Sequence, residues 1–287
     1  MRDTRLPLQD LSTRFSPAGR PVRRRAAARR AALAVAIAIA CGSASLGTGA
    51  AELSADQVCA VLTSASPSAP ADFAGKDLSD IDLSGVDLRN ADLRGANLFA
   101  TKLVQADLRG ANLAGATLNG AWLMGTDFSG ANLAGASLLS VVILGGQVKK
   151  MPIFKGANLS GVKMIADLPG ADLSGADLSR AMLGVNIENQ GMGQMRTDLS
   201  NADLSGARLI DADFNRSLMA YSSLKGANLR GANFFRVKFA GADFSGADVT
   251  DADFTEADLD RANFRGVKGF GAAKGLDRAE NVDKIVR

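Results

Sequence analysis

Large apolar residues recur at every fifth position through most of this chain. One unbroken series runs from Phe73 to Ile143, and a second runs from Leu199 to Phe264. Two positions before each large residue stands a small one, usually Ala, and Asp or Asn commonly stands between the two, as in Ala91-Asp92-Leu93. An internal repeat of this kind constrains the fold more strongly than any single residue does.

A five-residue period predicts a chain that turns a corner after every unit. Helices repeat near 3.6 residues and strands near 2, so neither keeps a five-residue pattern on one buried face. Within a unit, the small and the large residue lie two positions apart and point to the same side of an extended segment. Pairs such as Arg109-Gly110 supply the turns. Four units then close a square coil of about twenty residues, and successive coils stack at about 4.8 Å, like paired strands.

These units resemble the pentapeptide-repeat family, whose motif is A(D/N)LXX, over residues 71–266. The resemblance implies an all-β fold, a right-handed quadrilateral β-helix, and we expect short helical caps at its ends. Leu and Phe side chains are expected to fill the axis without leaving a channel. The core ladder that we expect comprises Leu88, Leu93, Leu98, Leu108, Leu113, Phe128, Leu204, Phe214, Phe244 and Phe254.

The period is first interrupted near residues 144–158. Sixteen residues separate Ile143 from Leu159, where fifteen would keep the register. Either three degenerate units carry one extra residue, or one unit carries a loop of eleven. Val148 and Ile153 occupy the positions of the missing centres, which favours a bulged coil.

A second interruption lies near residues 184–198. The interval from Leu183 to Leu199 is again sixteen residues long, and the same two alternatives apply. Here the centres would fall on Glu188 and Gly193, which are unsuited to an apolar core. This favours a loop that leaves the coil at a corner, a common location for functional residues.

Residues 1–50 are expected to be a secretory signal peptide with a long basic n-region. Arg29 and Arg30 end an arginine-rich stretch, and a short apolar run, Ala31–Ala40, is followed by small residues. We expect cleavage near Ala50 and a protein exported to the bacterial periplasm or secreted. Two alternatives stay open, namely lipid attachment at Cys41 and a retained anchor or disordered basic tail. The protein is expected at a membrane only if Cys41 is lipidated or the signal is uncleaved.

The remaining chain is expected to have three parts. Residues 51–70 form an N-terminal capping helix and linker, in which Ser54 and Gln57 fit a capping box. Residues 71–266 form the repeat, and residues 267–287, where the period is lost, form a C-terminal cap. Both caps would cover coil edges whose unpaired backbone groups otherwise favour association.

Composition argues against catalysis and metal binding. The chain has no His, so the commonest general base and metal ligand is absent, and its two cysteines are too far apart for a zinc site. Residues 1–51 hold nine Arg and two Asp, which leaves 24 Lys and Arg against 28 Asp and Glu in the rest, a net charge of −4. We therefore expect no enzyme activity, no cofactor, no metal site and no nucleic-acid partner.

Some outward positions carry an apolar residue instead of the usual polar one. When the sides of the square are numbered from Phe73, these apolar residues all fall on the second or third side, which suggests an interaction patch around Trp122. The candidate interaction residues are Phe99, Val104, Trp122, Met124, Leu139, Val142 and Leu144. The alternative is that the N-terminal segment or the irregular segments cover them.

Two functions follow as hypotheses. The first is an exported, non-catalytic scaffold that binds a protein partner or associates with itself as a homodimer. The second comes from the resemblance, since some pentapeptide-repeat proteins mimic duplex DNA and bind DNA gyrase, which confers quinolone resistance. That mechanism requires a cytoplasmic and strongly acidic protein, whereas here Lys and Arg interrupt the repeats. The first hypothesis is therefore favoured.

Overall fold

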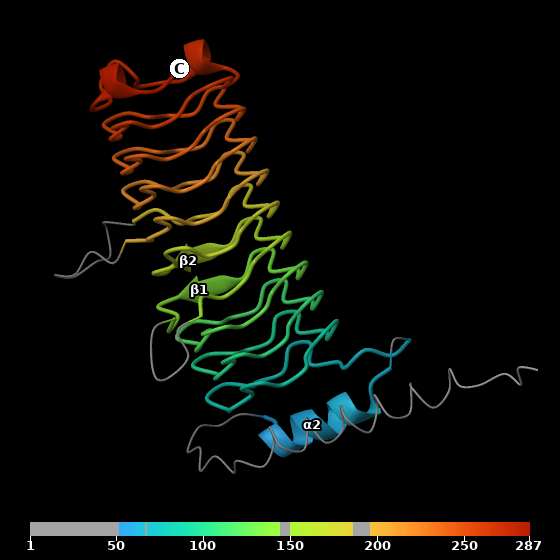
Figure 1. The fold of residues 1–287 in the computed structure, drawn as a ribbon. Coiled ribbons are helices and arrows are strands. Elements are labelled where there is room, and N and C mark those ends of the chain that lie inside the picture. Colours follow the sequence, from blue (N-terminus) through green and yellow to red (C-terminus); the bar gives the residue numbers. More distant parts are fainter. Residues whose placement is uncertain (1–51, 67, 144–149, 186–195) are drawn as a thin grey trace, which may run out of the picture. The chain divides into compact units, whose positions relative to one another are not determined.

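The computed structural model describes residues 52–66, 68–143, 150–185 and 196–287. In this part of the chain the five-residue units wind into coils that stack on one another (Figure 1). Parallel bridges join residues twenty positions apart, such as Asp72 to Asp92 and Asp92 to Asn112. A regular coil therefore contains four units, as the period predicts.

The bridges form four ladders, which define four faces. Each face is named here by the residues between which its ladder runs: face A from Asp72 to Lys268, face B from Asp77 to Lys274, face C from Asp82 to Glu280, and face D from Asp87 to Val286. Most extended segments are single bridge residues. Two short strands on face B, β1 (Ser137–Leu139) and β2 (Lys163–Ile165), pair in parallel.

A left-handed residue forms each regular corner. At the corner after Leu83, the N–H of Val86 donates to the carbonyl of Leu83 at 3.2 Å, and Gly85 has φ 69°. This combination is typical of a type II turn, whose third residue requires a positive φ. The small residue Gly is therefore common at this position, although Asp80 also adopts φ 59° there.

Outward Asp and Asn side chains stabilise these corners. Asp82 Oδ1 accepts a hydrogen bond from the N–H of Ser84 at 3.0 Å, and Asp127 Oδ1 accepts one from Ser129 at 2.9 Å. These N–H groups have no other hydrogen bond among the described residues. The Asp or Asn of the repeat therefore has a structural role beyond being outward and polar.

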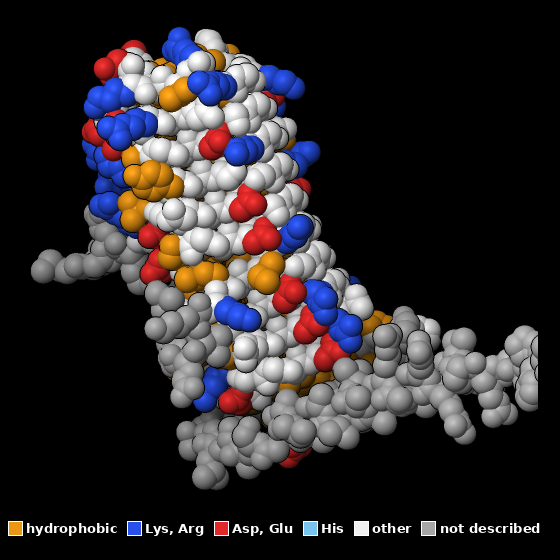
Figure 2. All heavy atoms as spheres, viewed as in Figure 1, with side chains coloured by type: hydrophobic (Ala, Val, Ile, Leu, Met, Phe, Trp, Pro, Cys, Tyr) orange, Lys and Arg blue, Asp and Glu red, His pale blue; other side chains and the backbone are white. Residues whose placement is uncertain are grey.

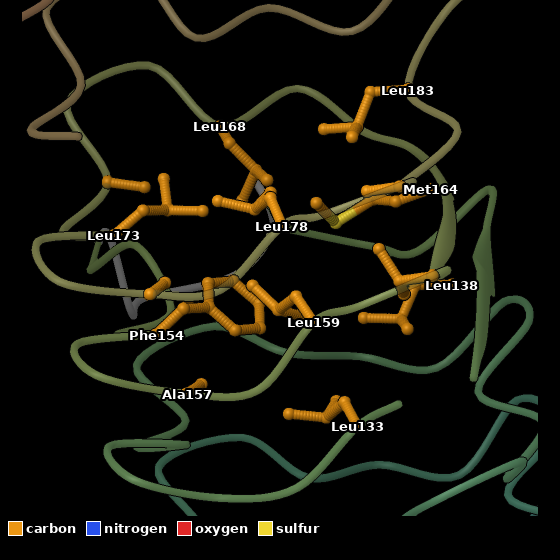
Figure 3. Close-up of a cluster of buried hydrophobic side chains, with 14 of the residues drawn as sticks. Leu133, Leu138, Phe154, Ala157, Leu159, Met164, Leu168, Leu173, Leu178 and Leu183 are labelled. Atoms are coloured by element: carbon orange, nitrogen blue, oxygen red, sulfur yellow. The ribbon is translucent and has the colours of Figure 1, made fainter. Parts of the chain in front are cut away.

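The core runs along the axis of the coils. All ten residues of the expected core ladder are 0% exposed. In Figure 3, the side chains of Leu133, Leu159 and Leu178 come from successive coils and lie one above another in the interior. Towards the C-terminus, Phe rings replace Leu at many centres and contact each other.

The first irregular segment is an insertion of six residues. Asp127 bridges to Ile153, 26 positions later instead of twenty. The core centre is Phe154, which is 0% exposed, whereas Ile153 points outward and is 37% exposed. Neither alternative drawn from the sequence was correct, because Phe154 stacks on Phe128, with ring centroids 5.2 Å apart, and this contact sets the register. Val148 lies outside the described residues.

The next coil is one residue shorter than a regular coil. Ile153 bridges to Asp172, nineteen positions later, and the centres Met164 and Leu168 are only four residues apart. The shortened unit follows strand β2. It explains why Leu168 returns to the register of the first repeat block.

The second irregular segment contains eleven extra residues. Asp167 bridges to Asp198, 31 positions later, and Leu183 and Leu199, both 0% exposed, are consecutive core centres. The interpretation of this segment as a loop requires the same number, eleven extra residues within one unit. Glu188 and Gly193 lie outside the described residues.

Helix α2 (Ala55–Ser64) precedes the first coil, and the capping box of Ser54 and Gln57 is present. Val58 of this helix is fully buried in the same cluster as Phe73. The N–H of Glu52 also donates to the carbonyl of Asp77 at 2.9 Å. In the part of the chain that is described, no helix has the length and apolar character needed to span a membrane.

Pairing continues beyond residue 266. Lys274, Glu280 and Val286 bridge to the preceding coil with spacings of 21, 22 and 23 residues. The additional residues form two short 3-10 helices, η2 (Phe270–Ala272) and η3 (Val282–Lys284). The segment expected as a separate C-terminal cap is thus largely a further, irregular coil.

Candidate interaction surface

The exposed apolar side chains Phe99, Trp122 and Met182 lie on faces B and C, whereas Ile153 and Val286 lie on face D. Phe99 is 49% exposed and Trp122 is 37% exposed. Val104, Leu139, Val142 and Ile165 are half-buried near them. These six residues are here called the Trp122 patch.

The backbone register places members of the Trp122 patch on neighbouring coils. Trp122 bridges to Val142 on face C, and Leu139 pairs with Ile165 between β1 and β2 on face B. Lys102 Nζ lies 5.9 Å from the centroid of the Trp122 ring, a cation–π contact at the border of the patch. Trp122 with Val142, and Leu139 with Ile165, therefore lie on pairs of consecutive coils.

Two of the predicted interaction residues, Met124 and Leu144, are not included in the Trp122 patch. Met124 is 3% exposed and is therefore buried, contrary to the prediction. It stands at a corner one coil before the six-residue insertion, and the adjacent Gly125 N–H donates to the carbonyl of Lys150, so this corner packs against the chain after the insertion. Leu144 lies outside the described residues, as does Cys41.

Ile165 was not among the predicted members. It follows the centre Met164 by one position, the same outward position that Phe99 and Leu139 occupy after their centres. The interruption of the period concealed this equivalence. Counting outward from Met164 instead of from Phe73 would have found it.

Face A is polar by contrast, and so is face D apart from Ile153 and Val286. On face D, Arg89 and Arg109 lie 2.6 Å from Asp87 and Asp107, respectively. On face A, a hydrogen bond from Arg94 lowers the pKa of Asp92 below its usual range. The pKa of Asp92 is thus shifted in the direction opposite to the raised pKa that is typical of a general acid. In the described ranges no group of three or more Asp, Glu, Cys or His side chains is arranged to hold a metal ion.

Asp167 on face C differs from the other repeat carboxylates. Its corner residue is Pro169, which has no N–H to donate, so the usual corner hydrogen bond cannot form. Its bridge partner is another carboxylate, Asp198, which accepts from the N–H of Ser200 at 2.8 Å. Partial burial and the negative charge of Asp198 raise the pKa of Asp167.

Asp167→Asn is expected to stabilise the protein at pH 7 by a few tenths of a kcal/mol, because the group is largely exposed. A raised pKa means that Asp167 holds its proton to higher pH in the folded state than in the unfolded state, so the contribution of Asp167 to wild-type stability falls as the pH rises above about 4. The gain should be absent at pH 3. Urea denaturation at both pH values measures it, with Asp82→Asn as a control that retains its corner acceptor. Equal stability of wild type and Asp167→Asn at pH 7 would contradict the repulsion.

A family model described as pentapeptide repeats matches this chain in eight copies, over residues 71–98, 91–130, 153–184, 197–236 and 232–268. A search of curated protein sequences finds no match.

Several solved structures are similar to this chain. HetL, a pentapeptide repeat protein involved in heterocyst differentiation regulation in the cyanobacterium Nostoc sp. strain PCC 7120, is 30% identical; the match covers 75% of this chain and 92% of HetL, with a TM-score of 0.35. A pentapeptide repeat protein from the Arabidopsis thaliana thylakoid lumen is also 30% identical, over 41% of this chain and 69% of its own, with a TM-score of 0.23. QnrB1, a plasmid-mediated fluoroquinolone resistance protein, is 23% identical over 74% of this chain and 87% of its own, with a TM-score of 0.32.

The sequence matches and the stacked five-residue units agree with each other. The family model covers more than half of the residues, and its matched ranges leave out residues 131–152, which include the first insertion, and residues 185–196, which lie in the second. This chain belongs to the pentapeptide repeat family.

Proposed function

We propose that this protein is a non-catalytic scaffold that binds a protein partner, or a second copy of itself, through the Trp122 patch. The observation that carries this proposal is the group of exposed and half-buried apolar side chains around Trp122 on faces B and C, whereas the exposed Ile153 and Val286 of face D have polar bridge partners. Grouped exposed apolar residues of this kind are typical of interaction sites. Trp is also among the residues that contribute most to binding energy at protein interfaces.

The fold supports such a role because it holds the patch rigidly. Each residue of the Trp122 patch lies on a coil that is hydrogen-bonded to its neighbours, as in Leu103 N to Trp122 O at 2.9 Å and Trp122 N to Thr101 O at 3.0 Å. A surface that is already ordered loses little conformational entropy on binding. We further propose that the coils are right-handed, as family membership implies, and that α2 and the segment containing η2 and η3 act as the end caps.

Export to the bacterial periplasm or secretion is part of the proposal. It is supported by the basic, then apolar, then small-residue pattern of residues 1–50. Cell fractionation followed by N-terminal sequencing of the mature protein tests it. A start near Ala51 in the envelope fraction is the expected result, a modified Cys41 would instead indicate a lipid anchor, and a cytoplasmic product that begins at Met1 would overturn export.

The gyrase-binding alternative lacks a specific observation in its favour. Mimicry of duplex DNA requires a strongly negative surface. Here Asp107 is paired with Arg109, and Asp243 lies 3.3 Å from Lys225 Nζ, so cations offset the carboxylates of face D. We therefore do not adopt it as a second function.

Trp122→Ala is expected to weaken partner binding or self-association by at least about 30-fold, which corresponds to the 2 kcal/mol typical of an interface hot spot. Sedimentation velocity measures self-association, and affinity capture from the envelope fraction with wild type and variant in parallel measures partner binding. Ile153→Ala is the matched control, since Ile153 is equally exposed, at 37%, but lies on face D. Unchanged association of Trp122→Ala in both assays would exclude the patch as the binding surface.

A further inference from the structure

The only Tyr of the chain, Tyr221, is placed unusually for a large side chain. It occupies the left-handed corner position, with φ 58°, and its side chain is 68% exposed. A bulky residue with a positive φ is a strained conformation. Because the ring is exposed, burial offsets little of that strain.

The next coil provides room for the Tyr221 ring. Its Cδ1 and Cε1 atoms lie 2.6 Å from the position that a Cβ of residue 241 would occupy, and residue 241 is Gly. The ring therefore lies against the backbone of the coil above. It is held as a flat, exposed apolar surface, which is a suitable anchor for a binding partner.

Basic and apolar residues lie on faces B and C, before Tyr221 on its own coil and at the equivalent positions of the next coil. The N–H of Arg216 donates to the carbonyl of Phe235 at 2.7 Å, and Leu218 bridges to Lys238, so these residues lie on two adjacent coils. We call this group the Tyr221 surface: Arg216, Leu218, Tyr221, Phe235, Arg236 and Lys238. Hydrophobic side chains next to Lys and Arg can be seen along the left edge of the C-terminal half in Figure 2.

Positive charge predominates on these two coils. On faces B and C, residues 213–221 and 233–241 include three cations and one carboxylate, Asp213. Asp213 accepts hydrogen bonds from the side-chain amides of Asn215 and Asn233. These two hydrogen-bond sites of the Asp213 carboxylate are therefore not available to a nearby cation.

The three cations differ in their partners. Arg236 lies over the Phe235 ring at 4.9 Å and contacts Glu256 at 2.6 Å, and Lys238 contacts Glu280 at 3.1 Å. Arg216 is half-buried and forms no ion pair with any residue that the structure describes. Its guanidinium is thus available to bind a carboxylate with two parallel hydrogen bonds.

We propose that the Tyr221 surface binds an acidic segment of a protein partner, with a carboxylate on Arg216 and an apolar side chain on the Tyr221 ring. Phe235 and Leu218 extend the apolar contact, and Arg236 and Lys238 add favourable potential. This surface shares no residue with the Trp122 patch. The proposal therefore does not depend on the function assigned to that patch.

Fluorescence anisotropy with three labelled peptides of equal length tests this proposal on the full chain. The peptides alternate Leu with Glu, with Gln or with Lys. We expect the Glu peptide to bind at least tenfold more tightly than the other two at low salt. Arg216→Gln and Tyr221→Asn should each weaken its binding about tenfold, since one carboxylate contact or one aromatic anchor is lost.

Three controls make the result specific. Asn tolerates a positive φ, so Tyr221→Asn should keep the fold, and its thermal unfolding can be compared with wild type. Arg230→Gln removes an exposed cation from face A, where Arg230 lies 3.6 Å from Asp248, and should leave binding unchanged. Trp122→Ala should also leave it unchanged, which separates this surface from the Trp122 patch.

Several results would overturn the proposal. Equal binding of all three peptides, or an equal loss in Arg230→Gln, would show that no specific site exists. Binding to phosphatidylglycerol vesicles that is lost in Arg216→Gln, without binding of the Glu peptide, would instead assign the surface to an anionic membrane.

Discussion

Phe254→Ala is expected to lower the free energy of unfolding by about 3–5 kcal/mol, the usual cost of removing a fully buried aromatic side chain. Phe254 is 0% exposed, and its ring centroid lies 5.3 Å from that of Phe234 and 5.9 Å from those of Phe244 and Phe264. The bridge between Asp253 and Lys274 holds the coil at this position, so the wall cannot collapse into the cavity. The full cost of the cavity should therefore be observed.

Chemical denaturation followed by circular dichroism measures this loss. Phe99→Ala is the matched control, because Phe99 is 49% exposed and its removal should change stability by less than about 0.5 kcal/mol. In a stack of coils each coil contacts only its neighbours, so the variant can also unfold locally near the C-terminus before the rest. A loss below about 1 kcal/mol would contradict a close-packed axis at Phe254.

Gly269→Ala is expected to destabilise the last coil for two reasons. Gly269 has φ 72°, a left-handed conformation that costs an L-residue about 1–2 kcal/mol. In addition, a Cβ at this position would lie 2.7 Å from the backbone N and Cα of Thr250 and would overlap its hydroxyl oxygen. Overpacking of this kind costs a further 1–3 kcal/mol or so, because backbone cannot move aside as a flexible side chain can.

Gly246→Ala separates the two contributions. Gly246 has a similar φ of 70°, but a Cβ there would meet no atom within 4 Å, so only the conformational cost remains. Thermal unfolding of the two variants and of wild type should therefore rank Gly269→Ala as the least stable. If both variants lose the same stability, the close approach to Thr250 is not present in solution.

The five-residue period was sufficient to predict the repeat architecture. It placed each small residue and each centre on the inside, and residues such as Leu88 and Phe214 are fully buried. The period also predicted a coil of four units, which the bridges from Asp72 to Asp92 and onward show. Both predictions depend only on local geometry that repeats in every unit, so a single sequence contains the information many times over.

The predictions that failed lie where the period stops. Ile153 was expected in the core, but Phe154 takes that place, because ring stacking on Phe128 is more favourable than keeping the count from Ile143. Met124 was expected outside, and it is buried beside the chain that returns after the insertion. Both outcomes depend on contacts between residues that are distant in the sequence.

The candidate surfaces show the same division. The outward position of Trp122 and Phe99 followed from the period alone. Ile165 joins them because β1 and β2 pair in parallel, and Tyr221 becomes notable because its ring lies on Gly241 one coil later. Neither relation can be found without knowing which residues of adjacent coils lie next to each other.

By itself, the sequence determined the repeating coil, its apolar axis and the polar character of most outward positions, since these follow from side-chain spacing within five residues. Only the tertiary structure decided how the six-residue and eleven-residue insertions are accommodated and which outward residues lie side by side on adjacent coils. The reason is physical: spacing within a unit is local, whereas stacking register is set by contacts between coils, such as that of Phe154 on Phe128.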